Sequence, residues 1–385
     1  MRSYKTEIVL NTQQEEKFFK TIGTCRFVYN LFLEKNKELY EKNKDTELPK
    51  YMSAYEFSKY LNNNFIPNNK EYIWIKEVST KSVWYAINNA NIAFLNFFKK
   101  NSKFPKFKKK DKNDCSMYFV RNHKDTIIPC ERHRIKIPLL GWCKLKEFGY
   151  IPINARIKSG NIIKEADRFY ISVLIEEDTP VKNNSKNDGL GIDLGVKNFA
   201  VISDSTTYKT LKQNKLEKRL KKEQNKISRK YELKKKNKNY NFTYKNIDKQ
   251  KVKIQKIYKK IANARNDYQN KVICEIIKRE PSFITVENLN VSGMIKNRHL
   301  SKAISNQRFY RFLDKLKYKC NLNGIELRQV DRFYSSSKIC CKCGNIKKDL
   351  KLSDRIYKCD CGNTIDRDLN ASINLKNAKE YKILT

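Results

Sequence analysis

The pattern that organises the chain is a short strand at Leu190–Val196. Apolar side chains occupy every second position, and two glycines flank a single carboxylate at the positions between them: Leu190, Ile192, Leu194 and Val196 against Gly191, Asp193 and Gly195. The first face would join a hydrophobic core, whereas the second would be bare backbone around Asp193. Such a face leaves room for a divalent metal ion and for an approaching phosphate backbone. An ordinary strand with a solvent-facing aspartate is the alternative interpretation.

The N-terminal region is predicted to be a strand followed by a helical bundle. Residues 4–10 follow a strand pattern, and Thr12-x-x-Glu15 has the form of a capping box that opens a helix. Apolar residues at helical spacing continue that helix: Phe18, Ile22, Cys25, Tyr29 and Phe32. Helical signals also run from Tyr51 to Asn62, and another helix is predicted to begin near Ser79.

The run Phe104–Lys110 breaks the helical pattern and interleaves aromatic rings with cations. This arrangement suits contact with a nucleic-acid backbone through Lys106 and Lys108, although a charged linker is the alternative. From Ser116 to Glu177 short β-type runs recur, the clearest being the alternation at Phe169–Ile175. With the N-terminal strand, these runs predict a β-barrel interrupted by the helical block.

The C-terminal half has the element order of an RNase H-like α/β domain. After a polar linker at Lys182–Asn187, the chain is predicted to form the Leu190 strand, a return strand and two basic helices separated by a polar turn around Asn237–Asn246. The later elements are a strand, a helix, a strand and a final helix: Phe283–Glu287, Asn306–Asn321, Ile325–Val330 and a helix near Asp368. In such a domain the acids belong on adjacent strands and on the last helix.

The net charge of the chain indicates what kind of partner it binds. The 385 residues carry 82 Lys+Arg against 41 Asp+Glu, a formal charge of +41, with 12% aromatic residues. So large an excess points to a polyanion, and the aromatic rings offer stacking surfaces for bases. Between Lys209 and Lys260 the excess is +17, from 21 basic and 4 acidic residues, and includes Lys234, Lys235 and Lys236. A solvated helical face is the alternative for that run, as it is for Arg26.

A membrane-surface protein is disfavoured, because no segment approaches 18 apolar residues and the N-terminus lacks the apolar core of a signal peptide. We therefore expect a cytoplasmic protein. Five of the eleven cysteines lie between Cys340 and Cys361, which favours a metal over disulfides. The others are expected to be buried thiols: Cys25, Cys115, Cys130, Cys143, Cys274 and Cys320.

The clustered cysteines form two knuckles, Cys340-x-x-Cys343 and Cys359-x-Cys361, each followed by a glycine. Four thiolates at this spacing predict a tetrahedral, structural zinc site with no position left for a substrate. Reduced core cysteines are the alternative. Because the second knuckle is one residue shorter than usual, Cys341 is a possible alternative ligand.

Three carboxylates from separate segments are what two-metal phosphodiester hydrolysis requires, since two Mg²⁺ ions roughly 4 Å apart must be held together. Asp193, Glu287 and Asp368 meet that description. Helix capping is the competing interpretation for the last segment. Asp366 fits an N-cap, whereas Asp368 would fall in the first helical turn.

Six motifs together resemble TnpB, the OrfB-type protein of bacterial insertion sequences. They are Cys25-Arg-Phe-Val-Tyr-Asn30, Phe104-Pro-Lys-Phe-Lys108, Gly191-Ile-Asp-Leu-Gly-Val-Lys-Asn198, Val286-Glu-Asn-Leu289, Ser335-Ser-Ser-Lys-Ile-Cys340-x-x-Cys343-Gly and Asp366-Arg-Asp-Leu-Asn-Ala371. The resemblance covers nearly the whole chain. The short knuckle Cys359-x-Cys361 is a departure from the family pattern and leaves the fourth zinc ligand open.

The resemblance implies an RNA-guided DNA endonuclease related to type V CRISPR effectors, with catalytic Mg²⁺ and structural Zn²⁺. Its expected partners are a guide RNA from the transposon end and double-stranded DNA with a short adjacent motif, in a bacterial, nucleoid-associated setting. The implied domains are a wedge β-barrel over residues 1–181 with a helical recognition insert at about 12–110, a RuvC-like nuclease over 182–334, a zinc-binding insert over 335–363, and the nuclease's last helix over 364–385.

Two rival functions remain. A non-cutting RNA-guided repressor of the same architecture would be expected to have lost one or more acids, yet all three are present. An accessory transposase is the other, but no nucleophilic tyrosine lies in a His-rich metal setting. In a guided nuclease the RNA reads the bases, so the protein needs mainly backbone contacts, which its lysine excess would supply.

Overall fold

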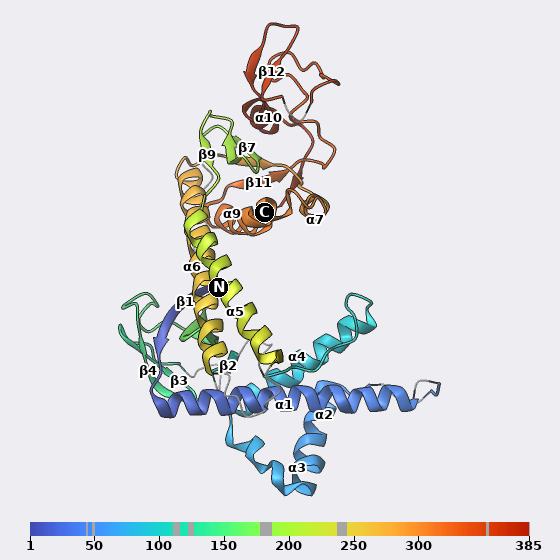
Figure 1. Ribbon diagram of the computed structural model, residues 1–385, viewed down its shortest axis with the longest axis vertical. Coiled ribbons are helices and arrows are strands. Elements are labelled where there is room, and N and C mark those ends of the chain that lie inside the picture. Colours follow the sequence, from blue (N-terminus) through green and yellow to red (C-terminus); the bar gives the residue numbers. More distant parts are fainter. Residues whose placement is uncertain are drawn as a thin grey trace. The chain divides into compact units, whose positions relative to one another are not determined.

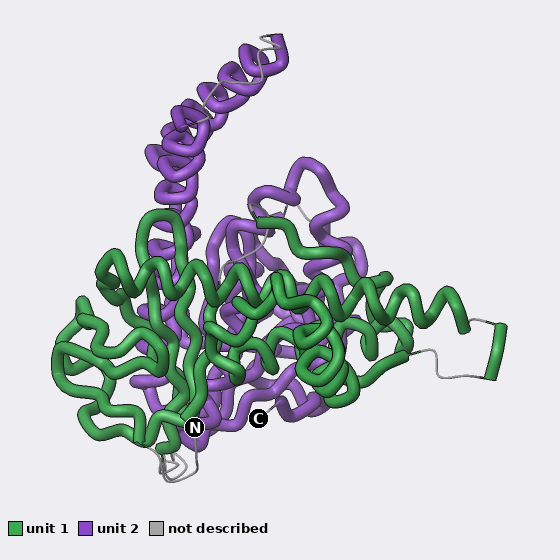
Figure 2. The backbone as a smooth tube through the Cα atoms, turned by 90° about the horizontal axis from the view of Figure 1, so that it is seen from below, with its two compact units in different colours: residues 1–178 green, residues 179–385 purple. Residues whose placement is uncertain are grey.

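The computed structural model describes residues 1–43, 45–47, 51–110, 116–121, 127–177, 187–236, 245–351 and 354–384. The chain divides into two compact units, Met1–Asp178 and Thr179–Thr385 (Figure 2). Cys115, most of the Lys182–Asn187 linker and most of the Asn237–Asn246 turn lie outside the described residues. The predicted domain boundary at residue 181 also lies there and stays a prediction.

The N-terminal unit contains one antiparallel sheet. Its strands are β1 (Arg2–Val9), β2 (Ser116–Val120), β3 (Arg134–Ile137), β4 (Gly141–Leu145), β5 (Ile157–Glu165) and β6 (Arg168–Ile175). The spatial order is β2-β5-β6-β1-β4-β3, so the first strand of the chain pairs with β6 and β4 near the middle of the sheet. No pairing joins the edge strands β2 and β3 in the part described, so closure into a barrel stays a prediction.

The helical part of this unit follows β1. It comprises α1 (Thr12–Asn43), α2 (Ala54–Tyr60), a π-helical turn (Leu61–Phe65), α3 (Ile66–Asn68), a 3-10 helix (Lys70–Glu77) and α4 (Thr80–Phe98). Edge-to-face rings hold its core, with the Phe32 ring centroid 5.0 Å from that of Phe57 and 6.2 Å from that of Phe94. The predicted helix start near Ser79 is confirmed, because Ser79 caps α4 through the amide of Ser82.

The capping box predicted at Thr12 and Glu15 is wrong by one residue. Asn11 accepts a hydrogen bond from the Gln14 amide at 2.9 Å, and the Gln14 side chain accepts one from the Asn11 amide at 3.0 Å. The side-chain amide nitrogen of Gln14 also donates a hydrogen bond to the carbonyl of Trp142 at 2.9 Å. This extra contact with the sheet ties the start of α1 to β4 and favours the Asn11 register.

The C-terminal unit is an α/β fold. Its main sheet has the order β14-β11-β10-β7-β8-β9, with strands β7 (Leu190–Leu194), β8 (Asn198–Ile202), β9 (Thr207–Lys209), β10 (Phe283–Val286), β11 (Glu326–Gln329) and β14 (Lys382–Ile383). Strands β7, β10 and β11 are parallel neighbours, and the other pairings are antiparallel. A separate hairpin pairs β12 (Ile356–Lys358) with β13 (Thr364–Asp366).

The described residues of this unit form the helices α5 (Asn214–Lys236), α6 (Lys245–Ile277), α7 (Val291–Ile295), α8 (Ser301–Gln307), α9 (Phe309–Asn323) and α10 (Arg367–Lys376). The predicted basic hairpin is confirmed, since α5 and α6 lie side by side (Figure 1). The predicted helix Asn306–Asn321 is wrong at its start, because Arg308 adopts a left-handed backbone with φ of 52° and separates α8 from α9. None of the helices in the described ranges is both long and apolar enough to cross a membrane.

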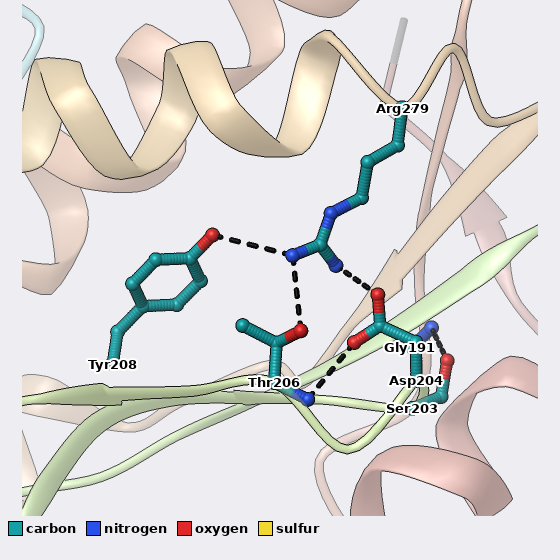
Figure 3. Close-up of polar contacts among 6 residues, drawn as sticks. All are labelled: Gly191, Ser203, Asp204, Thr206, Tyr208 and Arg279. Carbon is teal, nitrogen blue, oxygen red and sulfur yellow. Dashed lines mark hydrogen bonds and ion pairs between the residues drawn. The ribbon is translucent and has the colours of Figure 1, made fainter.

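A polar network around Arg279 joins the end of α6 to the β8–β9 turn (Figure 3). The Arg279 guanidinium donates to Asp204, to the Thr206 hydroxyl at 3.1 Å and to the Tyr208 hydroxyl at 3.5 Å. In the same region the Ser203 hydroxyl accepts a hydrogen bond from the Gly191 amide at 3.1 Å. The Arg279 contacts therefore hold the end of α6 against the β8–β9 turn. The Ser203 contact holds the end of β8 against β7, the strand that carries Asp193.

Candidate acid cluster and cysteine centre

The sheet register brings the first two predicted acids together. Strands β7 and β10 pair in parallel, with Ile192 opposite Val286. One residue further on, the same register sets Asp193 beside Glu287, on strands that lie about 4.8 Å apart. The sequence alone does not indicate how close Asp193 and Glu287 lie in space, because the two acids are far apart along the chain.

Helix α10 supplies the third acid by packing directly on β7 (Figure 1). A Cβ atom added to Gly191 would lie 1.9 Å from the Ser372 carbonyl oxygen and 2.5 Å from the Lys376 amide nitrogen, so only glycine permits this approach. The Lys376 ammonium also pairs with Asp188, ahead of β7. The helix therefore runs antiparallel to β7, and Asp368, one turn before Ser372, comes level with Asp193.

The electrostatics agree with this placement. Burial raises the pKa of Asp193 well above its usual range, and the charges of Glu287 and Asp368 raise it further. Burial also raises the pKa of Glu287, and a hydrogen bond from the Ser336 hydroxyl offsets part of that rise. Strongly shifted carboxylates that cluster in this way mark a candidate functional site, and a bound cation would relieve their repulsion.

The three acids are less tightly grouped than the four cysteines. Within the described ranges, the four cysteines are the only group of three or more His, Cys, Asp or Glu residues whose ligand atoms all lie within 4.8 Å of one another. The ligand atoms of the three carboxylates are therefore spread more widely than the four sulfurs.

The cysteine centre is compact and preassembled. Cys340 lies 3.7 Å from Cys361 and Cys343 lies 3.5 Å from Cys359, measured between sulfur atoms. Four sulfurs at about 2.3 Å from a tetrahedral zinc ion would lie about 3.8 Å apart. Although burial alone would raise it, hydrogen bonds from backbone amides and from Asn363 lower the pKa of Cys340 to about 6. A hydrogen bond from the Asn345 amide lowers the pKa of Cys343, but burial and the neighbouring sulfurs outweigh it and raise that pKa to about 12.

The short second knuckle closes through the β12–β13 hairpin. The turn between these strands carries Cys359 and Cys361, and Gly362 adopts a left-handed backbone with φ of 82°. Cys341 is not part of the cluster; its amide donates to Asn370 and its sulfur accepts from Asn363. The geometry thus selects Cys361 over Cys341 as the fourth sulfur, and the four-cysteine cluster suggests a zinc-binding site.

Two buried asparagines of α10 connect the two centres. Asn370 donates to the Ile339 carbonyl at 2.7 Å and accepts from the Cys341 amide at 3.0 Å. Asn374 donates to the carbonyls of Ser336 and Ile339, both at 2.7 Å. Since Ser336 also donates to Glu287, the first knuckle, α10 and one of the acids share a hydrogen-bonded network. Sequence reasoning missed these residues, although their i, i+4 spacing on an otherwise apolar helix face was a visible signal.

The predicted nucleic-acid residues lie on both units. Arg26 and Lys108 line one cavity of about 80 Å³ in the N-terminal unit, together with the stacked rings of Tyr85 and Tyr118. The Lys108 ammonium lies 4.0 Å from the centroid of the Tyr29 ring, and burial lowers its pKa. Lys106 is exposed and lines a different pocket. In the C-terminal unit, Lys234, Lys235 and Lys236 are exposed at the end of α5.

Comparisons with known proteins agree with this organisation. Three family models match the chain: "Helix-turn-helix domain" of the OrfB_IS605 type over residues 1–45, "Probable transposase" OrfB_IS605 over 170–298, and "Cas12f1-like, TNB domain" over 309–375. The chain is 27% identical over 392 residues to the "Putative RNA-guided DNA endonuclease InsQ" of Escherichia coli K12, covering 97% of this chain and 91% of that one.

Two further proteins extend the comparison. A "Putative RNA-guided DNA endonuclease" of Streptomyces pristinaespiralis is 27% identical over 97% of this chain and 88% of its own length. The solved Cas12f1-sgRNA-target DNA complex aligns with a TM-score of 0.59 and 16% identity, covering 96% of this chain and 84% of that one, which shows a shared fold. With the OrfB and Cas12f1-like family matches, these similarities support a TnpB-type protein.

Proposed function

We propose that this chain is an RNA-guided DNA endonuclease that cuts target DNA with a RuvC-like acid cluster formed by Asp193, Glu287 and Asp368. The observation that carries the proposal is the meeting of β7, β10 and α10, where burial, and then the charges of Glu287 and Asp368, raise the pKa of Asp193. Two relatives carry the name "Putative RNA-guided DNA endonuclease", and the neighbouring structure is a Cas12f1-sgRNA-target DNA complex.

The residues of the cluster have separable roles in this proposal. Asp193 and Glu287, on neighbouring strands, and Asp368, on the helix above them, would hold two magnesium ions, which supply an activated water and charge neutralisation at the leaving oxygen. Ser336 orients Glu287 through its hydroxyl. Arg367, with its guanidinium 3.8 Å from the Asp368 carboxylate, partly balances the negative charge and lowers the pKa of Asp193.

The basic residues would hold the nucleic acids. Arg26, Lys106 and Lys108 in the N-terminal unit, and Lys234–Lys236 at the end of α5, are the proposed phosphate contacts to guide RNA and DNA. A short motif beside the target would be recognised by the protein, while the guide reads the remaining sequence by base pairing. The N-terminal sheet would form the wedge barrel of this architecture, and the four cysteines would hold a structural zinc ion.

The test is a cleavage assay on purified protein co-expressed with its flanking RNA. We expect Mg²⁺-dependent double-strand cutting with the RNA and none without it. Glu287→Ala should abolish cutting while guided DNA binding survives, and Glu380→Ala, which removes an exposed acid near the C-terminus, should cut normally. Guided binding by the wild type without cutting would instead favour a non-cutting binder, and undiminished cutting by Glu287→Ala would refute the acid assignment.

A further inference from the structure

Four cations from two helices gather where α9 begins. Arg308, Arg311 and Lys315 follow one stripe at spacings of three and four residues, and Arg265 of α6 joins them, since the charges of Arg265 and Arg308 influence each other. The stripe faces α6, because the Lys315 ammonium donates to the Asn270 side chain of that helix at 2.8 Å. We call these four residues the Arg308 cluster.

Among the described residues, the positive charge of this cluster is only partly balanced. Glu217 of α5 is the acid that pairs with it, but Glu217 is shared between Arg265 at 3.5 Å and Lys302 at 2.7 Å. Across the part of the chain that the structure describes, Arg308 and Arg311 form no ion pair. The cations therefore repel one another with little relief from carboxylates.

Burial makes this imbalance more costly. Arg308 and Lys315 are half-buried. Burial, and then the charge of Arg311, lowers the pKa of the Arg308 guanidinium, and the pKa of Lys315 falls for the same reasons with an added effect of Arg308. Exposed lysines elsewhere on α9, such as Lys317 and Lys319, sit in solvent. The Arg308 cluster thus differs from an ordinary solvated basic face.

The backbone adds an independent sign of a built site. Arg308 holds a left-handed conformation, with φ of 52°, that is unfavourable for a residue with a Cβ atom. The carbonyl of Gln307, just before it, accepts a hydrogen bond from the buried Gln269 side chain of α6 at 2.8 Å. The strained turn is therefore held in place by α6 and sets a half-buried guanidinium at the N-terminus of α9.

We propose that the Arg308 cluster binds a phosphodiester group of a nucleic-acid backbone. A guanidinium offers paired donors that match two phosphate oxygens, and a phosphate would supply the missing negative charge between helices α6 and α9. The site rests on the proposed function, because it assumes that the C-terminal unit contacts nucleic acid. The sequence did not predict this contact, because the strongest excess of lysine lies in the hairpin of α5 and α6 rather than in α9.

The test compares two variants with equal loss of charge on the same helix. The Arg308→Gln/Arg311→Gln variant removes two cluster cations, and Lys317→Gln/Lys319→Gln removes two exposed ones as the control. Both are prepared as the full chain. One arm measures affinity for the flanking RNA across a salt series, and the other measures affinity of the RNA-loaded protein for target duplex. Arg311→Gln alone leaves the strained turn untouched and serves as a second cluster variant that is expected to fold.

We expect the cluster variants to flatten the salt dependence in one arm. The slope should fall by up to roughly 0.9 for each duplex phosphate that the variant no longer neutralises, or about 0.7 for each single-stranded phosphate. The arm that changes identifies the source of the phosphate as DNA or RNA. Lines that coincide with the wild type in both arms, or an equal change in the control, would overturn the site. If the wild type binds neither nucleic acid, the proposed function itself fails.

Discussion

The acid cluster and the cysteine centre, both in the C-terminal unit, differ in how much of each exists before a metal ion binds. The cysteine sulfurs lie 3.5 and 3.7 Å apart in pairs, close to the spacing that zinc imposes, and one thiol already favours its ionised form. The carboxylates are more widely spread, and burial, together with the charges of Glu287 and Asp368, raises the pKa of Asp193. In the proposed function, the first centre would hold its ion permanently and the second would exchange ions with substrate.

Loss of a metal ion should have different consequences at the cysteine centre and at the acid cluster. A structural ion with four protein ligands contributes folding free energy to the segment it closes, whereas a catalytic ion held by a few carboxylates contributes mainly to the reaction. The asparagines of α10 make the two centres mechanically dependent, because they bind the knuckle that carries Cys340 and Cys341. Removing one ligand from each centre in turn should separate these contributions.

The largest effect is expected from removing an acid. Asp193→Ala should reduce cleavage below detection because the central carboxylate of the cluster is lost, while zinc content and guided DNA binding stay at wild-type levels. The measurements are product formation on a plasmid target and metal analysis of the same protein batch. Loss of zinc from this variant would contradict the separation of the two centres.

Next in size is the loss of a cysteine. Cys343→Ser should lose stoichiometric zinc and loosen α10, because the knuckle that Asn370 and Asn374 bind would no longer be held. Amide hydrogen exchange in α10 should rise, and cleavage should fall as a consequence of that loosening. Cys274→Ser is the matched control, because this cysteine of α6 lies outside the cluster and is exposed, so its prediction as a buried thiol was wrong. A wild-type protein without zinc would refute the zinc assignment.

The elements that carry both centres could be predicted from the sequence, and their contacts could not. Alternation around Asp193 predicted β7, and cysteine spacing predicted the knuckles, because both are local patterns. The left-handed turn at Arg308 depends on a hydrogen bond from Gln269 of α6 to the Gln307 carbonyl. The sequence pattern does not reveal that contact and therefore predicts a helix that begins at Asn306. The Asn11 cap depends on a contact with β4, far along the chain. Tertiary contacts of this kind leave no periodic signal.

A smaller effect is expected at Ser336, which lies between the two centres. Ser336→Ala should lower cleavage by about 10–100-fold, as loss of a hydrogen-bond partner of a metal ligand usually does, and should raise the Mg²⁺ concentration needed for half-maximal rate. Ser336→Thr should restore most activity because it keeps the hydroxyl. Ser335→Ala, at the exposed neighbouring serine, is the control. An unchanged Mg²⁺ requirement in Ser336→Ala would show that the contact with Glu287 does not serve the metal site.

The smallest effect concerns the stability of the metal-free protein, in which the buried, mutually repelling acids should lower the free energy of unfolding. The raised pKa of Asp193 means that its proton stabilises the folded state at low pH, and this contribution is lost as pH rises through the folded-state value. Near neutral pH, Asp193→Asn should therefore unfold at a temperature roughly 2–4 °C higher than the wild type, corresponding to about 1 kcal/mol in a unit of this size.

The measurement is thermal unfolding over a pH series in magnesium-free buffer, without a chelator that would strip the cysteine centre. Adding Mg²⁺ should stabilise the wild type more than Asp193→Asn, because only the wild type then relieves repulsion among three carboxylates. Cys343→Ser should move in the opposite direction, to lower unfolding temperature at every pH. If Asp193→Asn were destabilised in the same way, the carboxylate would be a structural anchor like the cysteines, and the contrast between the two centres would fail.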